Sequence, residues 1–158
     1  MGLTIHFEGR LRCESSFSKL MGIARAFAKL HKFKYYVLDE RDRNLLRLVN
    51  RKLVEYYGPT KGIIIVPEKN CEPVIMEFDR DLCIQNFCKT QYADAAIHIT
   101  VINLIREIEP YFQILHVFDE GEYWEKRDID LLREKFIIAS ELRKHKKPIP
   151  GFKGHSYL

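Results

Sequence analysis

The stretch GIIIVPEKNCEPVIMEFDRDLCIQNFC, residues 62–88, decides the fold. It contains three short apolar runs, at 62–66, 73–79 and 82–88, that are rich in the β-branched and aromatic residues typical of strands. A short Pro-containing connection separates the first two runs, and a tight turn at 79–81 separates the second and third. Because neither connection has room for a helix, the three runs are expected to form an antiparallel meander.

Helices and further strands are expected on both sides of this meander. Apolar residues at helical spacing predict helices at 17–31, 43–57, 94–109 and 128–144. Asp94 and Asp128 supply caps for the last two helices, and Pro110 stops the third. Alternating apolar and polar residues predict strands at 3–11, 33–38 and 113–118. Since strands and helices come in groups, the prediction is one α+β domain over 1–144, with a mostly antiparallel five- or six-stranded sheet and helices on one face.

Positive charge is concentrated at the C-terminal end of the chain. The formal net charge is +4, from 26 Lys and Arg against 22 Asp and Glu. Five of the basic residues and none of the acidic ones lie in 143–158, which leaves 21 basic against 22 acidic residues, or −1, elsewhere. Residues 145–158 are therefore predicted to form a mobile basic tail, and the body presents no excess of positive charge for nucleic acid.

Several patterns predict a cytoplasmic protein without a membrane segment. The sequence begins without the basic and then apolar pattern of a secretory signal, and no apolar run approaches the roughly 18 residues of a membrane span. The four cysteines are irregularly spaced and include no Cys-x-x-Cys pair, so reduced thiols are expected in place of a zinc site or a disulfide framework.

The segment 119–125, DEGEYWE, combines four carboxylates with the only tryptophan of the chain. One interpretation is the approach to a helix, where acidic residues are favourable and the aromatic residues hold the loop to the core. The other is one wall of a pocket, with carboxylates that bind a hard cation or act as acid and base, and with Trp124 raising the pKa of a neighbouring carboxyl by desolvation.

The segment 89–98 is a second candidate site. Lys89, Thr90 and Gln91 place an ammonium, a hydroxyl and an amide in one turn, where they would bind an anion together with free N–H groups of helix 94–109. His98 falls within the apolar arc of that helix. It is either a core histidine with a satisfied ring nitrogen or an imidazole aimed at a pocket from the first helical turn.

Two further sequence patterns allow weaker interpretations of function. Cys71 and Glu72 lie at the tip between two predicted strands, but a nucleophilic Cys71 needs an activating base that the sequence does not show. Arg43, Arg47 and Arg51 recur every four residues on predicted helix 43–57. Such a stripe is either a solvated helix face or a surface that follows phosphates.

Four stretches resemble a family of small bacterial proteins of unassigned activity: LTIHF (3–7), CEP (71–73), FCKTQYA (87–93) and DEGEYWEKRD (119–128). The resemblance extends to about Asp128 and excludes 34–62. It implies that these stretches share a site that includes His98, and it weakens Glu122, because similar sequences often have glycine there. It implies no activity, substrate or cofactor.

The first hypothesis is a small-molecule or anion-binding cleft built from 89–98 and 119–125, with acid–base catalysis left open. Its catalytic candidates are His98, Glu120 and Glu125. Its ligand-binding candidates are Cys71, Glu72, Lys89, Thr90, Gln91, Asp119, Tyr123 and Trp124. No metal or cofactor is assigned.

The alternative is a non-enzymatic interaction module of the inhibitor, immunity or adaptor type. In it, Tyr123 and Trp124 are exposed anchors among carboxylates that meet a basic protein partner. Nucleic-acid binding through Arg43, Arg47 and Arg51 is a minor alternative.

Overall fold

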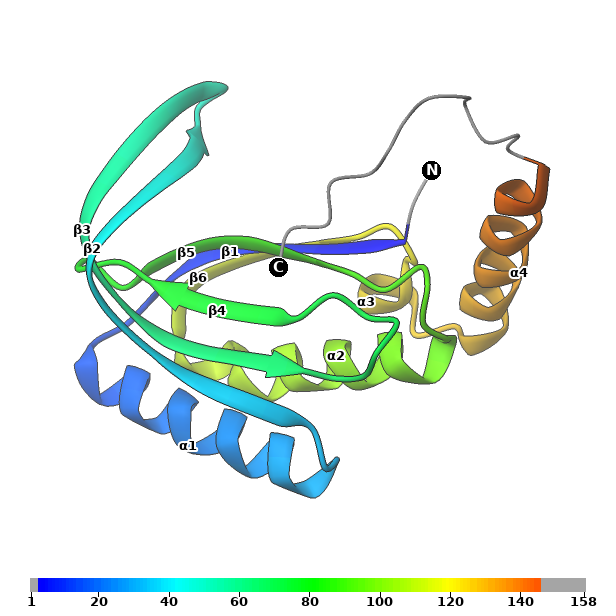
Figure 1. Ribbon diagram of the computed structural model, residues 1–158, viewed down its shortest axis with the longest axis horizontal. Helices are drawn as coiled ribbons and strands as arrows, with labels where there is room; N and C mark the ends of the chain where they lie inside the picture. The colour runs from blue at the N-terminus through cyan, green and yellow to red at the C-terminus, as the bar shows by residue number, and fades with distance from the viewer. Residues whose placement is uncertain (1–2, 146–158) are drawn as a thin grey trace.

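The computed structural model describes residues 3–145 and confirms the α+β class (Figure 1). The strands are β1 (Thr4–Leu11), β2 (Lys34–Val49), β3 (Lys52–Val66), β4 (Val74–Phe78), β5 (Cys83–Lys89) and β6 (Phe112–Asp119). The helices are α1 (Glu14–Leu30), α2 (Ala95–Ile108), the short 3-10 helix η1 (Glu109–Tyr111), α3 (Tyr123–Lys126) and α4 (Ile129–His145). The predicted tail lies outside the described residues, apart from His145 at the end of α4.

The six strands form two three-stranded antiparallel sheets, with the orders β5-β1-β6 and β2-β3-β4. The predicted single sheet of five or six strands is therefore wrong. The break falls between β4 and β5, in the middle of the predicted meander. There the Asp79 carboxylate accepts the N–H of Cys83 at 3.0 Å. The backbone bonds of the turn run from Asp79 N–H to Cys83 O and from Leu82 N–H to Asp79 O. Beyond the turn, β5 pairs with β1 along its whole length.

One hydrophobic core joins both sheets to α1 and α2, which lie on one face of the sheets (Figure 1). Ile5, Leu20, Phe78 and Ile102 are among its fully buried side chains. Without β2 and β3, the order β1-α1-β4-β5-α2-β6 is that of the split βαβ motif. Among the described helices, none combines the length and the apolarity needed to cross a membrane.

Residues 43–57, predicted as a helix, form the outer part of the β2–β3 hairpin instead. Asn50 and Arg51 connect the strands with φ of 49° and 63°, the two positive values that a type I′ turn requires. A spacing of four residues fits one face of a helix and also one face of a strand, because four is a multiple of the strand period. The recurring arginines therefore did not distinguish the two structures.

Residues 41–58 of this hairpin, called the arm below, rise from the sheets on the side opposite α1 and α2 (Figure 1). The pairing shifts between Glu40 and Arg43, so that Arg41 and Asp42 lie opposite Pro59 alone. Such a β-bulge bends and twists a strand pair. The bulge explains why the arm leaves the plane of the sheet.

Ion pairs hold the root of the arm against β4. Arg43 donates two hydrogen bonds to the buried Glu77 carboxylate, at 2.9 and 3.0 Å, and Arg47 pairs with the buried Asp79. Burial acts to raise the pKa of Glu77, but the bonds from Arg43 and Thr60 outweigh it and leave the pKa below its ordinary value. Two of the three arginines considered for phosphate binding are therefore engaged within the fold.

Candidate functional site

The imidazole of His98 lies at the centre of a fully buried polar network. Its Nδ1 is 2.7 Å from Oγ1 of Thr90, which follows β5. Its Nε2 is 2.9 Å from Oδ1 of Asp119, at the end of β6, and has no other polar partner among residues 3–145. This distance places the ring nitrogen and the carboxylate within the range of an ion pair. Thr90 also contacts Leu3 O, at 3.2 Å, which ties the network to the chain just before β1.

The Asp119 carboxylate also organises the loop that follows it. It accepts the N–H of Gly121 at 2.7 Å and that of Trp124 at 2.9 Å. Burial acts to raise the pKa of Asp119, but His98 and the two N–H groups outweigh it and keep the pKa below its ordinary value. The carboxylate therefore acts as an acceptor inside the fold, and both of its oxygens are occupied.

Packing around His98 leaves no room for a ligand. A Cβ on Gly121 would lie 2.8 Å from Nε2 and 2.7 Å from a methyl group of Leu132. The ring of Phe136 stands edge-on to the imidazole, at 5.8 Å between centroids. A general base must reach the proton that it abstracts, directly or through one water. His98, with a side chain that is 0% exposed, has no such path in this conformation.

Cys71, Glu72 and Lys89 gather in a second place, where the β3–β4 loop meets the end of β5. Glu72 N–H donates to Lys89 O at 3.2 Å, and its carboxylate accepts the N–H of Lys89 at 3.1 Å. The ammonium of Lys89 lies 5.8 Å from the ring of Tyr92, and Gln91 O accepts from Arg143. These candidates contact backbone and neighbouring side chains and do not converge with His98 on a common cavity.

The remaining candidates of the acidic segment point in different directions. Glu120 turns to the opposite side of the sheet from Asp119. There it accepts the N–H of Thr4 at 2.8 Å and lies 4.0 Å from His6. Tyr123 and Trp124 pack against the core, and the guanidinium of Arg106 covers the indole ring at 4.2 Å. Glu125 is exposed on α3. Trp124 is thus neither the wall of a cleft nor a freely exposed anchor.

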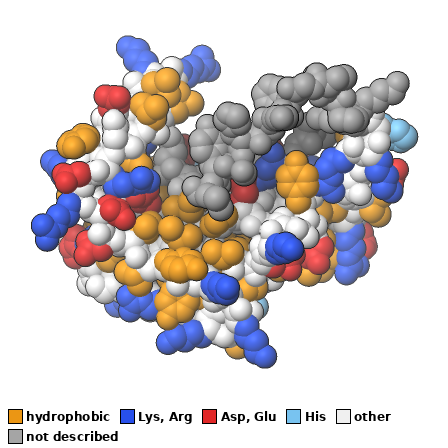
Figure 2. Space-filling view, in the orientation of Figure 1, with side chains coloured by type: hydrophobic (Ala, Val, Ile, Leu, Met, Phe, Trp, Pro, Cys, Tyr) orange, Lys and Arg blue, Asp and Glu red, His pale blue; other side chains and the backbone are white. Residues whose placement is uncertain are grey.

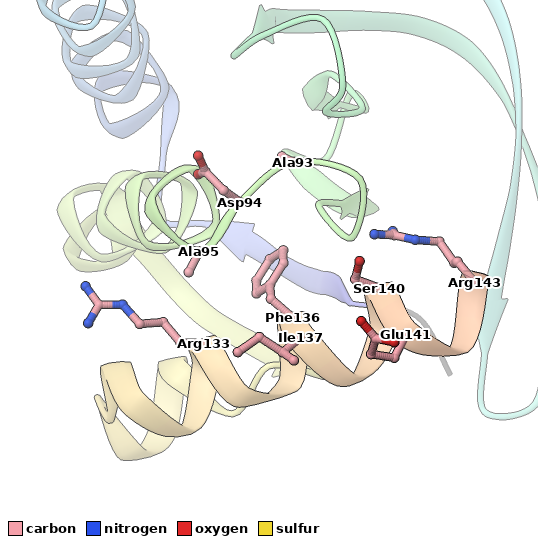
Figure 3. A pocket seen from close by; sticks show the side chains of 9 residues that line it. All are labelled: Ala93, Asp94, Ala95, Arg133, Phe136, Ile137, Ser140, Glu141 and Arg143. Carbon is pink, nitrogen blue, oxygen red and sulfur yellow. The ribbon is translucent and has the colours of Figure 1, made fainter. Parts of the chain in front are cut away.

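The two candidate segments line different pockets. A pocket of about 480 Å³ lies between the start of α2 and α4. Phe136 points into it, and Arg133 and Arg143 stand at its ends (Figure 3). Another, of about 620 Å³, lies between the end of β6 and α4 and includes Asp119 and Glu120. The first pocket takes Ala93, Asp94 and Ala95 from 89–98, none of which is a predicted ligand-binding residue.

A third hollow, of about 580 Å³, lies between the arm and the outer face of sheet β5-β1-β6, and we call it the outer groove. Phe87, His6 and Phe118 stand side by side across its floor on three neighbouring strands, with 5.9 and 5.8 Å between ring centroids. Leu46 and Leu48 of the arm form its other wall. Figure 2 shows hydrophobic side chains on the arm.

Gln85 fixes the arm over this face. Its amide accepts the N–H of Leu48 at 2.8 Å and donates to Leu48 O at 2.9 Å. The same amide nitrogen donates to Glu8 at 2.8 Å. Neither Glu8 nor Glu120 pairs with a lysine or arginine among residues 3–145, so the groove carries negative charge beside its aromatic rings.

Sequence reasoning did not select the residues of the outer groove. The missed signal is in β6, where Leu115 and Val117 alternate with Ile114, His116 and Phe118. When helices cover only one face of a sheet, the large side chains on the other face of a strand stay exposed. Within residues 3–145, no group of three or more His, Cys, Asp or Glu side chains is placed to hold a metal ion.

Comparison with protein-family models, with curated proteins and with solved structures finds no match. The resemblance to small bacterial proteins therefore stays a prediction, and the geometry of the chain itself carries the functional argument.

Asp119→Asn should lower the free energy of unfolding by about 3 kcal/mol at pH 7, because it leaves buried His98 without its charged partner. The pKa of Asp119 is lower in the folded protein than its unfolded value near 3.8. The contribution of the carboxylate to the free energy of unfolding is therefore complete above the unfolded pKa, and it is lost as the pH falls through the folded pKa. The difference between the two proteins should therefore shrink as urea unfolding is measured from pH 7 down to pH ~3. The control variant Glu125→Gln changes an exposed position, so its free energy of unfolding should stay within about 0.5 kcal/mol of the wild-type value. Equal stability of the Asn variant and the wild type would contradict the structural role.

Proposed function

We propose that the protein is a non-enzymatic binding module that holds a partner protein in the outer groove. The observation that carries the proposal is the aromatic row Phe87–His6–Phe118, which lies open beneath an arm that also exposes apolar side chains. Phe118 is 63% exposed and Phe87 is 52% exposed, although both are large apolar residues on regular strands. Contiguous apolar surface of this kind marks interaction sites in monomeric proteins.

The arm adds to the apolar surface. Leu46, Leu53 and Tyr57 are 66%, 74% and 67% exposed. A two-stranded arm that exposes such side chains gains little stability from them in the free protein. Their burial against a partner would release water from both surfaces, which favours association.

Charge indicates the kind of partner. Glu8 lines the groove and Glu120 lies 4.0 Å from His6 of the aromatic row, and neither pairs with a lysine or arginine in the described part of the chain. Apolar anchors ringed by carboxylates suit a partner segment with aliphatic or aromatic residues next to lysine or arginine. This keeps the basic protein partner of the sequence-based alternative but moves its binding surface from Tyr123 and Trp124 to the outer groove.

The positions of the predicted catalytic residues favour binding over catalysis. His98, Thr90 and Asp119 are buried and committed to one another, and Glu125 stands alone on α3. Catalysis needs an acid, base or nucleophile within hydrogen-bonding reach of a bound substrate. The arrangement of the predicted catalytic residues does not provide this.

Site-specific photo-crosslinking tests the proposal in the cells that naturally make the protein. Benzoylphenylalanine in place of Phe87 should give one discrete crosslinked protein, whereas the same group in place of exposed Ala26 on α1 should give none. Adding Leu48→Asp, which places a charge on the arm wall, should abolish the product while the circular dichroism spectrum stays unchanged. Equal products from positions 87 and 26, or no product from position 87, would contradict the proposal.

A second candidate is a small-molecule site in the pocket of about 620 Å³ between β6 and α4. Its size is that of a typical ligand pocket. Its lining combines apolar side chains with five charged residues, Asp119, Glu120, Glu122, Glu134 and Lys135. A ligand there should raise the melting temperature in a thermal-shift screen of metabolites. Ala139→Trp, which fills the pocket, should remove that rise. A rise that survives the substitution would place the ligand elsewhere.

A further inference from the structure

Two cysteine side chains lie next to each other where the two sheets meet. The Sγ atoms of Cys71, in the β3–β4 loop, and Cys88, in β5, are 4.0 Å apart. Cys88 is 0% exposed and Cys71 is 7% exposed. The other two cysteines, Cys13 and Cys83, are on different parts of the surface and take no part in this contact.

Hydrogen bonds of the thiols and of the neighbouring backbone hold this pair in place. Cys88 Sγ donates to Glu72 O at 3.4 Å, and Cys71 Sγ lies 3.9 Å from Lys89 O. The two chain segments are joined by the bonds of Glu72 with Lys89. To form a disulfide of about 2.05 Å, the sulfur atoms must approach by roughly 2 Å. The loop and β5 already run side by side, so the required approach is small.

We infer that Cys71 and Cys88 form a redox-active pair, a modification site that a low-molecular-weight disulfide such as oxidised glutathione converts to an intramolecular disulfide. The thiolate of Cys71 attacks one glutathione sulfur, breaks the glutathione disulfide and releases one glutathione thiolate. That thiolate takes up the proton that Cys71 lost when it ionised. The Cys88 sulfur then attacks Cys71 Sγ while its proton passes to the second glutathione, which leaves as a thiol. Two cysteine thiols are oxidised, and one glutathione disulfide is reduced to two glutathione thiols.

The surroundings assign the first attack to Cys71. Cys71 is the less buried of the two residues, at 7% exposure against 0% for Cys88. The hydrogen bond with Cys88 lowers the pKa of Cys71, and the same contact together with burial raises the pKa of Cys88. A thiolate is the reactive form in exchange with disulfides. Cys88 then acts as the resolving thiol.

The disulfide would add a covalent link between the two sheets where Glu72 and Lys89 already form hydrogen bonds. The turn between β4 and β5 already joins them at one end, near Asp79 and Cys83. Cys71 lies at the opposite end of β4, and Cys88 lies near the opposite end of β5. A cross-link that closes the loop from Cys71 to Cys88 is expected to raise the melting temperature of the protein by about 6 to 12 °C.

The test uses the full chain with Cys13→Ser and Cys83→Ser, so that Cys71 and Cys88 are the only thiols. The protein is equilibrated in glutathione buffers of rising oxidised fraction, quenched with acid and alkylated. Mass spectrometry should show the two thiols disappearing together, and non-reducing peptide mapping should give a Cys71–Cys88 link. The oxidised form should melt about 6 to 12 °C above the reduced form.

Single variants in the same background separate the roles of the two thiols. Cys88→Ala should accumulate a Cys71–glutathione adduct, because the resolving thiol is gone, whereas Cys71→Ala should leave Cys88 unmodified. Free thiols that persist in fully oxidised glutathione would overturn the inference. Equal glutathione adducts on both single variants would overturn the assigned order of attack, and an unchanged melting temperature would overturn the coupling of the sheets.

Discussion

The buried pairing of His98 with Asp119 is the interaction on which much of the structure depends. It joins α2 to the end of β6, and Thr90 extends it to the segment after β5 and to the chain before β1. A buried carboxylate and imidazole are costly unless each polar atom finds a partner. The N–H groups of Gly121 and Trp124 supply the remaining donors, and this requirement sets the course of the loop between β6 and α3.

This constraint explains the composition of the acidic segment. Asp119 points into the core, and the next residue, Glu120, points to the outer face, as alternation at the end of a strand requires. Gly121 is needed because a side chain there would collide with His98 and Leu132. Trp124 lies between the core and Arg106. Neighbouring carboxylates of one short segment therefore have different partners: Asp119 pairs with buried His98, and Glu120 bonds to Thr4 beside His6.

Elements with local signals could be predicted from the sequence. Helix α2 begins where the Asp94 carboxylate accepts the N–H of Ile97 and ends just before Pro110, and both signals lie within the helix or next to it. The arm could not be assigned in this way, because its arginines are four residues apart and its stability depends on Glu77 and Asp79 far along the chain. The separation of β4 from β5 likewise depends on a side chain that competes with the backbone for one N–H group.

The candidate site was predictable in part. His98, Thr90 and Asp119 were selected as residue types that carry chemistry, and they do meet in space. The core position of His98 was one of the two interpretations that the sequence left open. The choice between them depends on Phe136 and Leu132 of α4, which pack near the imidazole from a distant segment. The outer groove was missed because the hairpin was assigned as a helix. Without the arm, Phe87 and Phe118 are only two exposed aromatic residues.

The buried His98 serves the fold, and the outer face is the proposed binding surface. The most direct measurement is chemical modification of the folded protein with diethyl pyrocarbonate, mapped by mass spectrometry. His6 and His116 are exposed on the outer face and should be modified, while His98 should remain unmodified as long as the circular dichroism spectrum is native. Modification of His98 at a rate close to that of His6, with the fold intact, would show an accessible imidazole and contradict the account.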